Sequence, residues 1–344
     1  MLTMTAFPIT SAPWGDATLY TLRNAQGMRV TISDLGATMV NWFAPDRSGR
    51  MADVLLGWNE QAQYRDNSCY FGSVVGRWAN RIRDGRFTLD GVDYQVDQNQ
   101  GQTHLHGGHT GFHHRRWHAK TEGDTLHLSL VSPEGDAGFP GTLHTEVSYR
   151  LDDEGTLLLD YCAVSDAATP VNLTSHAYFN LNGGEAGIGD HLIQIDADEY
   201  LKIDSVSIPV EQVDVAGSAF DFRQPAPIGT RLDWPDGQLA LASGFDHCYC
   251  LNGEANRLRP VATVYDPTSG RELTVATSER GLQFYTGNFL DGVAGRRDYR
   301  SHDGFCLEAQ AYPDQVNGAD AERAILRPGE MYRQQTSYRL GVRR

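Results

Sequence analysis

The sequence has few cysteines, and no arrangement of them suits a disulfide framework or a zinc site. The chain has 344 residues and five cysteines, an odd number without a C-x-x-C pair. Because disulfides persist mainly in oxidising compartments, we expect reduced thiols and a cytoplasmic location. Cys248 and Cys250 lie two residues apart in a predicted strand, where we expect both to pack as small hydrophobic side chains.

Long apolar runs and an excess of basic residues are also missing. No stretch of about 18 apolar residues occurs, so no membrane span is expected. Residues 1–15 carry no Lys or Arg ahead of an apolar block, which argues against a secretory leader. The formal net charge is −15, and such a charge repels nucleic acid and anionic membranes. It also disfavours a strongly anionic substrate, unless the site has a local basic pocket.

Sustained helical periodicity is absent, and alternation with a period of two residues takes its place. Residues 28–33 and 126–130 alternate between apolar and polar side chains, and 156–164 has the pattern of a mostly buried strand. Residues 261–265 and 273–276 flank a turn at 267–270. The clearest signal is Asp90-Gly91 between two alternating runs in 86–96, because both residues of such a hairpin turn need a positive φ.

Glycine and proline divide the chain into many short strands. There are 36 glycines and 14 prolines, and only residues 59–64 suggest a short helix. This pattern predicts an all-β protein, a large antiparallel sandwich with few short helices. Because β sandwiches often exceed 200 residues and no low-complexity linker is visible, we expect residues 1–344 to form a single domain.

Six of the twelve histidines lie between His104 and His118. The spacing H-x-H-x-x-H at 104–109 occurs in some two-metal hydrolases, but those enzymes carry an Asp at the position of Gly108 and need an αβ framework. We therefore expect no metal site. Gly107-Gly108 indicates a tight turn or close approach of a ligand, which His106 would touch. The other five are expected to be polar loop residues: His104, His109, His113, His114 and His118.

Two further residues suit acid–base chemistry, although each taken alone suits a structural role. His176 lies in a strand-like run, as a satisfied core histidine would. Glu308 also lies among apolar neighbours, so it needs a partner or has a raised pKa. Arg81 has several fixed donors for a sugar hydroxyl or a carboxylate, but a single arginine is more often part of a structural ion pair.

Six segments together resemble the aldose 1-epimerase (galactose mutarotase) family. They occur in the family's order and cover nearly the whole chain, which makes the set much more specific than any one segment. They are GRWANRI at 76–82, LHGG at 105–108, NLTSHAYFNL at 172–181, GFDH at 244–247, GLQFYTGNF at 281–289 and CLEAQAYPDQVN at 306–317.

This resemblance implies a β-supersandwich with an open sugar cleft and no cofactor. Glu308 matches the family's general base and His176 its general acid. Five residues match positions that contact the substrate: Asn80, Arg81, His106, Asp246 and Gln283. The implied activity is that of an isomerase, an aldose 1-epimerase that interconverts the α and β anomers of a free aldose such as galactose or glucose. The substrate would be a small monosaccharide, and the chain a monomer or homodimer.

The sequence departs from the family pattern at two places near the expected cleft. Cys248 follows Asp246-His247 where relatives often have Asn, and His113-His114 replace an acidic–basic pair that is common after the Gly-Gly loop. Both departures bear on substrate preference rather than on the type of reaction.

Three alternatives remain open on the sequence alone. An epimerase of phosphorylated hexoses would use the basic run at 113–116. A glycosidase would use Asp246 and Glu308 as its two carboxylates. A carbohydrate-binding protein without catalysis would stack sugars on Trp42, Trp78 or Trp117, although each tryptophan is more simply explained as a core or rim residue.

Overall fold

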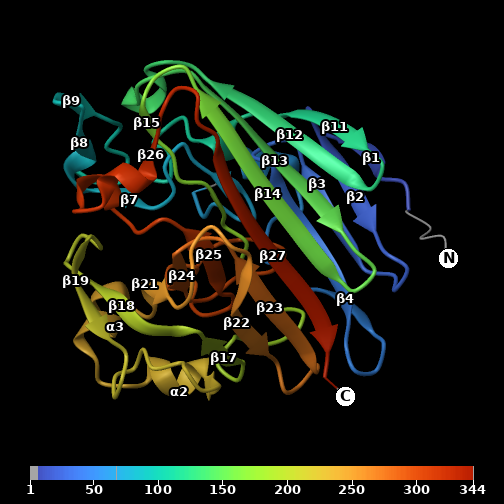
Figure 1. Cartoon of the computed structure of the whole chain (residues 1–344). Helices are drawn as coiled ribbons and strands as arrows, with labels where there is room; N and C mark the ends of the chain where they lie inside the picture. The colour runs from blue at the N-terminus through green and yellow to red at the C-terminus, as the bar shows by residue number, and fades with distance from the viewer. Residues whose placement is uncertain (1–6, 67, 344) are drawn as a thin grey trace.

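The computed structural model describes residues 7–66 and 68–343, and their strands form three large antiparallel sheets (Figure 1). Residues 1–6, on which part of the argument against a secretory leader depends, lie outside the described residues. The first sheet has the order β1-β2-β3-β4-β5. Its strands are β1 (Thr10–Trp14), β2 (Ala17–Arg23), β3 (Arg29–Ser33), β4 (Thr38–Pro45) and β5 (Met51–Asp53).

The largest sheet has nine strands and includes the C-terminal strand at its centre. In spatial order the strands are β11 (His118–Glu122), β12 (Thr125–Ser132), β13 (Leu143–Leu151), β14 (Thr156–Ser165), β27 (Tyr332–Val342), β23 (Arg271–Thr277), β22 (Arg259–Tyr265), β17 (Leu192–Ile195) and β20 (Ala226–Pro227). The red β27 therefore runs beside the green β14, which is far from it in sequence (Figure 1).

The third sheet is five-stranded and carries most of the motifs named above. In spatial order its strands are β19 (Pro209–Asp214), β18 (Ala197–Ile203), β21 (Asp246–Leu251), β24 (Gly281–Tyr285) and β25 (Cys306–Gln310).

Short paired strands and helices complete the described fold. The two-stranded pairs are β7 (Arg81–Ile82) with β10 (His104–Leu105), β8 (Arg86–Leu89) with β9 (Val92–Gln95), β6 (Val74–Val75) with β16 (Thr174–Ser175), and β15 (Thr169–Pro170) with β26 (Ile325–Leu326). The helices are α1 (Gln61–Arg65), α2 (Ile228–Leu232) and α3 (Gly237–Ala242), with 3₁₀ turns η1 (Arg83–Gly85), η2 (Phe112–His114), η3 (Asp136–Gly138), η4 (Gln315–Asn317) and η5 (Ala321–Ala324).

This architecture confirms the predicted antiparallel all-β fold with few short helices. The predicted hairpin is β8–β9, and Asp90 and Gly91 have φ values of 52° and 79°, as its turn requires. The strands predicted at 28–33, 126–130, 156–164, 261–265 and 273–276 correspond to β3, β12, β14, β22 and β23. No helix within 7–66 and 68–343 is long and apolar enough to cross a membrane.

The main core joins the first sheet to the nine-stranded sheet and also includes side chains of the third sheet. Val30, Ile32 and Trp42 from the first sheet share one buried cluster with Leu128 and Val147 from the other. Along β14 buried and half-buried residues alternate, because successive side chains of a strand point to opposite faces. The predicted period of two therefore reflects one face of the sheet that packs into this core.

A buried arginine connects the two sheets. Arg271 of β23 is 1% exposed. Its guanidinium donates hydrogen bonds to the carbonyls of Ala44 at 3.2 Å, Leu181 at 2.7 Å and Arg50 at 3.1 Å. These carbonyls belong to the end of β4, the turn after it and the loop before β17, so one side chain satisfies backbone acceptors of three segments.

We predict that Arg271→Ala lowers the free energy of unfolding by at least about 3 kcal/mol, because it leaves a cavity and removes three buried hydrogen bonds. Urea denaturation followed by circular dichroism measures this. The control is Arg339→Ala on the neighbouring strand β27, where the side chain is exposed and a change below about 0.5 kcal/mol is expected. Equal stabilities of the two variants would contradict the structural role of Arg271.

Candidate active site

The third sheet has one apolar face and one polar face. Leu282, Phe284 and Leu307 point into the main core. Gln283 and Glu308 are direct partners across β24 and β25, so their side chains point to the opposite face. Asp246 is paired with Tyr285 one step along the same face.

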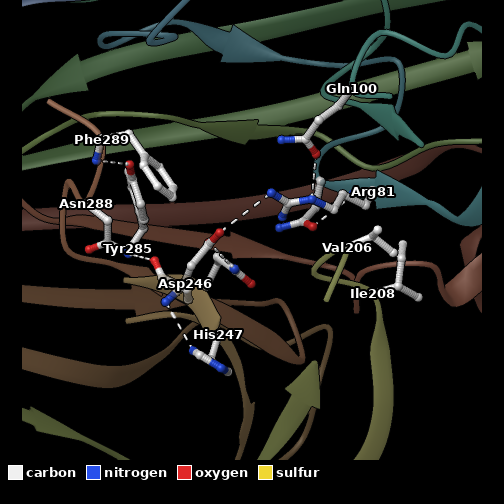
Figure 2. A network of polar contacts seen from close by, with 12 residues as sticks. Arg81, Gln100, Val206, Ile208, Asp246, His247, Tyr285, Asn288 and Phe289 are labelled. Carbon is white, nitrogen blue, oxygen red and sulfur yellow. Dashed lines mark hydrogen bonds and ion pairs between the residues drawn. The ribbon is translucent and has the colours of Figure 1, made fainter. Parts of the chain in front are cut away.

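Arg81 approaches this face from β7 and joins a chain of polar contacts (Figure 2). Its Nη2 lies 3.6 Å from Oδ2 of Asp246, and its Nε donates to Oε1 of Gln100 at 2.8 Å. Gln283 donates from Nε2 to Oδ1 of Asp246 at 2.7 Å. The side chains of Arg81 and Asp246 remain 10% and 14% exposed, so this pair is reachable from solvent.

His176 follows β16 and faces Glu308. Its Nε2 lies 3.8 Å from Oε1 of Glu308, and the two side chains are only 6% and 3% exposed. Oε2 of Glu308 has no hydrogen-bond partner in the described part of the chain. A nearly buried carboxyl oxygen without a partner is a strong acceptor for a substrate hydroxyl.

Burial disfavours the charged form of both groups. It raises the pKa of Glu308 well above its usual value, the negative charge of Asp246 raises it further, and Arg81 opposes them. Burial also lowers the pKa of His176 to about 4. Burial thus favours the uncharged form of each group, a protonated Glu308 beside a neutral His176.

His106 lies beside this pair, and the backbone of Asn80 fixes which of its nitrogens carries the proton. The Asn80 N–H donates to Nδ1 of His106 at 3.1 Å, and the His106 N–H donates to the Asn80 carbonyl at 3.1 Å. Because Nδ1 accepts, the neutral ring carries its hydrogen on Nε2 and offers a donor there. Burial keeps the ring neutral, since it lowers the pKa of His106 well below its usual value.

The same hydrogen bond decides whether the three groups suit a metal ion. His106, His176 and Glu308 each offer a ligand atom, and these atoms lie within 4.8 Å of one another, which resembles a two-histidine, one-carboxylate site. A ligating nitrogen must present its lone pair, but Nδ1 of His106 already accepts the Asn80 N–H and Nε2 holds the hydrogen. The donor set suits hydrogen bonding to oxygen better than coordination.

Gly107 and Gly108 pack against protein rather than leaving room for a ligand. A Cβ at Gly107 would lie 1.7 Å from the Gly76 carbonyl oxygen, and one at Gly108 would lie 2.6 Å from Oδ2 of Asp97. The Gly-Gly pair indicates either a tight turn or the close approach of a ligand, and the structure shows a tight turn packed against the protein. The turn holds His106 in its left-handed conformation, with a φ of 51°.

The prediction of polar loop residues is wrong for two of the five other histidines in this region. His104 and His113 are buried, with 0% and 3% exposure. Nδ1 of His104 donates to the Asp97 carbonyl at 2.8 Å while Nε2 accepts the Gly107 N–H at 3.2 Å, so His104 supports the turn. His109 is an exposed loop residue, as predicted, whereas His118 is exposed but begins strand β11 instead of lying in a loop.

Several residues around His176 had no individual signal in the sequence. The rings of Tyr70 and Tyr178 stack on it with centroid distances of 5.5 and 5.1 Å. Sγ of Cys306 lies 3.6 Å from its Nδ1. Tyr178, Tyr285 and Cys306 lie within the quoted motifs, but only the folded chain shows that they surround the imidazole.

The tryptophans and the basic run on which two of the alternative functions depend have structural roles. Trp42, Trp78 and Trp117 are buried in core clusters and present no platform to a sugar. Arg115 and Arg116 form ion pairs with Asp136 at 2.9 Å and Asp34 at 2.7 Å. The basic run at 113–116 therefore supplies no unpaired guanidinium for a phosphate.

The two departures from the family pattern differ in their environment. Cys248 is buried in a small cluster with Leu201, Cys250 and Tyr312, so both cysteines of β21 pack as predicted. The ring of His113 lies 4.6 Å from that of Tyr70. Of the two, His113 is therefore the one that contacts the surroundings of His176.

The chain is similar to known proteins over nearly its whole length. The family model described as aldose 1-epimerase matches residues 18–339. Galactose mutarotase from Bos taurus is 42% identical over 346 residues, covering 97% of this chain and 99% of the relative. Aldose 1-epimerase from Escherichia coli K12 is 39% identical over 326 residues, covering 93% and 94%. The crystal structure of galactose 1-epimerase from Lactobacillus acidophilus superimposes with a TM-score of 0.87, 30% identity, and 98% and 99% coverage.

We predict that Gly107→Ala lowers kcat at least 10-fold and lowers the melting temperature, because the new methyl group must displace the Gly76 carbonyl and with it His106. Sugar anomerisation and thermal unfolding measure the two effects. Gly101→Ala is the control, since Gly101 also has a positive φ, 63° against 90° for Gly107, but nothing within 4 Å of the added Cβ. A Gly107→Ala variant as active as the Gly101→Ala variant would contradict this role.

Proposed function

The chain belongs to the aldose 1-epimerase family and is an isomerase that interconverts the α and β anomers of an aldose; we propose that Glu308 and His176 carry its two proton transfers. The observation that supports this assignment most directly is the 3.8 Å separation of two buried acid–base groups, on the polar face of a sheet that also presents Asp246 and Gln283.

Ring opening needs one proton removed and one supplied. Glu308, as carboxylate, takes the proton from the C1 hydroxyl while His176, as imidazolium, gives one to the ring oxygen, and the C1–O5 bond breaks. Rotation about C1–C2 then presents the other face of the aldehyde. In reclosure Glu308 returns its proton to O1 and His176 recovers one from the C5 hydroxyl, which produces the opposite anomer.

The neighbouring side chains bind and orient the sugar. The Nε2–H of His106 and the guanidinium of Arg81 donate to sugar oxygens that gain negative charge during ring opening. Asp246 accepts from sugar hydroxyls, and Gln283 and Arg81 hold its carboxylate in place. We propose that Asn80 also contacts the substrate. Within the fold its N–H donates to Nδ1 of His106 and its Oδ1 accepts the Arg81 N–H.

Binding of the sugar changes which residue of the pair carries the proton. Without a bound sugar, burial favours a proton on Glu308 and a neutral His176. A sugar places hydroxyl and ether oxygens between them, which lets the single proton lie on His176 while the carboxylate accepts the O1 hydroxyl. Both arrangements contain the same number of protons, so no exchange with solvent is needed to reach the reactive one.

We propose a free aldose, with galactose first, as the substrate. The relatives from Bos taurus and Lactobacillus acidophilus are named for galactose. The net charge of −15 and the ion-paired state of Arg115 and Arg116 both disfavour a phosphorylated hexose.

Three broader proposals concern the whole chain. One domain over residues 1–344 is supported by a main core that takes side chains from Leu22 through Leu340. Residues 1–6, 67 and 344 of that range lie outside the described residues. A cytoplasmic location is supported by the five free cysteines. A monomer or homodimer remains our proposal for the oligomeric state, and sedimentation analysis tests it.

We predict that the wild type accelerates mutarotation of fresh α-galactose and α-glucose, and that Glu308→Gln and His176→Asn each lower kcat by about 10²–10⁴-fold. Both variants keep the size and polarity of the side chain but lose its proton transfer, so sugar binding and folding should be largely retained. Polarimetry measures the rates, and calorimetry measures sugar binding.

The matched control for Glu308→Gln is Glu279→Gln. Burial raises the pKa of Glu279 to about 7, but it lies outside the proposed site. It should keep near wild-type activity, which separates loss of one buried carboxylate from loss of the base. No acceleration by the wild type would refute the function, and a folded Glu308→Gln or His176→Asn variant at wild-type rate would refute that residue's role.

We also predict a bell-shaped pH profile for kcat/KM. As pH falls through about 4, where the pKa of His176 lies, a second proton enters the pair and the base is lost. As pH rises through the raised pKa of Glu308, the last proton leaves and no acid remains. Between these limits one proton is present and the rate is maximal. Initial rates at subsaturating sugar measure the profile, and a rate that increases steadily across both limbs would contradict it.

A further inference from the structure

Tyr70 has an unusual backbone conformation for a large side chain. Its φ is 59°, in the left-handed region that favours glycine. Residues held in such conformations need support from the surrounding structure, and they cluster at functional sites. None of the six quoted segments includes Tyr70, so the family resemblance does not explain this conformation.

The ring of Tyr70 contacts both histidines of the active site. Its centroid lies 5.5 Å from that of His176, with 24° between the two planes, so the rings are stacked. The centroid of His106 lies 4.7 Å away at 58°, and that of His113 4.6 Å away at 63°. One half-buried side chain therefore packs against three imidazoles from two separate segments.

The backbone ties Tyr70 to His176 as directly as the rings do. The Gly72 N–H donates to the His176 carbonyl at 3.0 Å, and the His176 N–H donates to the Ser73 carbonyl at 2.9 Å. The Ser73 N–H donates in turn to the Tyr70 carbonyl at 3.1 Å. Together these three hydrogen bonds connect the turn at 70–73 to the backbone of His176 and hold Tyr70 and His176 in a fixed relative position.

Gly72 makes this turn rigid. Its φ is 67°, and a Cβ there would lie 2.1 Å from the Met39 carbonyl oxygen. The Met39 N–H also donates to the Gly72 carbonyl at 2.8 Å. The strand β4 therefore packs directly against the turn that follows Tyr70.

The titratable and charged groups around His176 come from several elements. Glu308 and Cys306 face it from β25, and Tyr285 faces it from β24. His106 packs edge-on after β10, His113 of η2 is electrostatically coupled to it, and Tyr178 stacks on it from two residues along the chain. Among these, Tyr70 is the half-buried ring that stacks on the imidazole.

We propose that Tyr70 is a positioning residue for the general acid: its ring fixes the planes of His176 and His106 and covers His176 from water. The proposal rests on the role proposed above for His176. The stacked ring keeps Nε2 of His176 directed at Glu308, 3.8 Å away, and a tilted imidazole would lose this alignment. Burial by the ring also contributes to the desolvation that lowers the pKa of His176.

Removing the ring should slow catalysis, and removing only the hydroxyl should not. We expect Tyr70→Ala to lower kcat by about 100-fold, as a displacement of about 1 Å in a catalytic group does. Tyr70→Phe keeps the stacked ring and should stay within about 3-fold of wild type. The control is Tyr94→Ala, which removes a half-buried tyrosine stacked on Phe87 in the β8–β9 hairpin and should leave kcat unchanged.

The acid limb of the pH profile distinguishes positioning from a general loss of structure. In Tyr70→Ala the imidazole gains contact with water, so its pKa should move from about 4 towards its ordinary value of about 6.5. The acid limb should move up by at least one pH unit, while it stays in place in Tyr70→Phe and Tyr94→Ala.

Tyr70→Gly is the second variant, because glycine adopts the left-handed φ without strain and keeps the test valid if Tyr70→Ala fails to fold. It should show the same loss of kcat and the same shift of the acid limb. A folded Ala or Gly variant at wild-type rate, an unmoved acid limb, or an equal loss in Tyr70→Phe would overturn the proposal. An inactive wild type would instead refute the function itself.

Discussion

The alternation of side chains across β21, β24 and β25 is the constraint on which the site depends. Glu308, Gln283 and Asp246 share one face because each lies an even number of residues from, or directly opposite, the next. The same alternation sends Leu307, Leu282 and Phe284 into the main core. A shift of one residue in either pairing would exchange the faces, burying the acids in the core and exposing the apolar side chains. The free energy that stabilises the core therefore also fixes the register of the proposed site residues.

Burial on the polar face then sets the chemistry of these groups. Glu308 is disfavoured as an anion by desolvation and by Asp246, and Arg81 reduces this effect without removing it. His176 is disfavoured as a cation by desolvation, because its side chain is buried. Because both groups resist charge, they favour the neutral arrangement with the proton on Glu308, and in the proposed mechanism a bound sugar stabilises the charged arrangement that ring opening requires.

Local patterns predict much of the fold because they depend on neighbours in sequence. The β8–β9 hairpin follows from Asp90-Gly91, whose positive φ values are a local requirement, and the strands follow from the period of two. The identities of Glu308 and His176 came from motif resemblance, since neither residue differs locally from a structural one. The stacking of Tyr70 on His176 and the tautomer of His106 depend on contacts between segments about 26 to 106 residues apart. Gly107-Gly108 showed that the backbone is constrained, but not that the Gly76 carbonyl is the reason.

The Asn80 N–H that occupies Nδ1 of His106 has a consequence for the catalytic cycle as a whole. With its proton fixed on Nε2, this third imidazole can donate a hydrogen bond but cannot take up either of the two protons that Glu308 and His176 are proposed to exchange with the sugar. Each group that changes protonation in ring opening is restored in ring closure. In the proposed mechanism the enzyme therefore leaves one turnover in the state in which it begins the next, with no separate step of reprotonation by water.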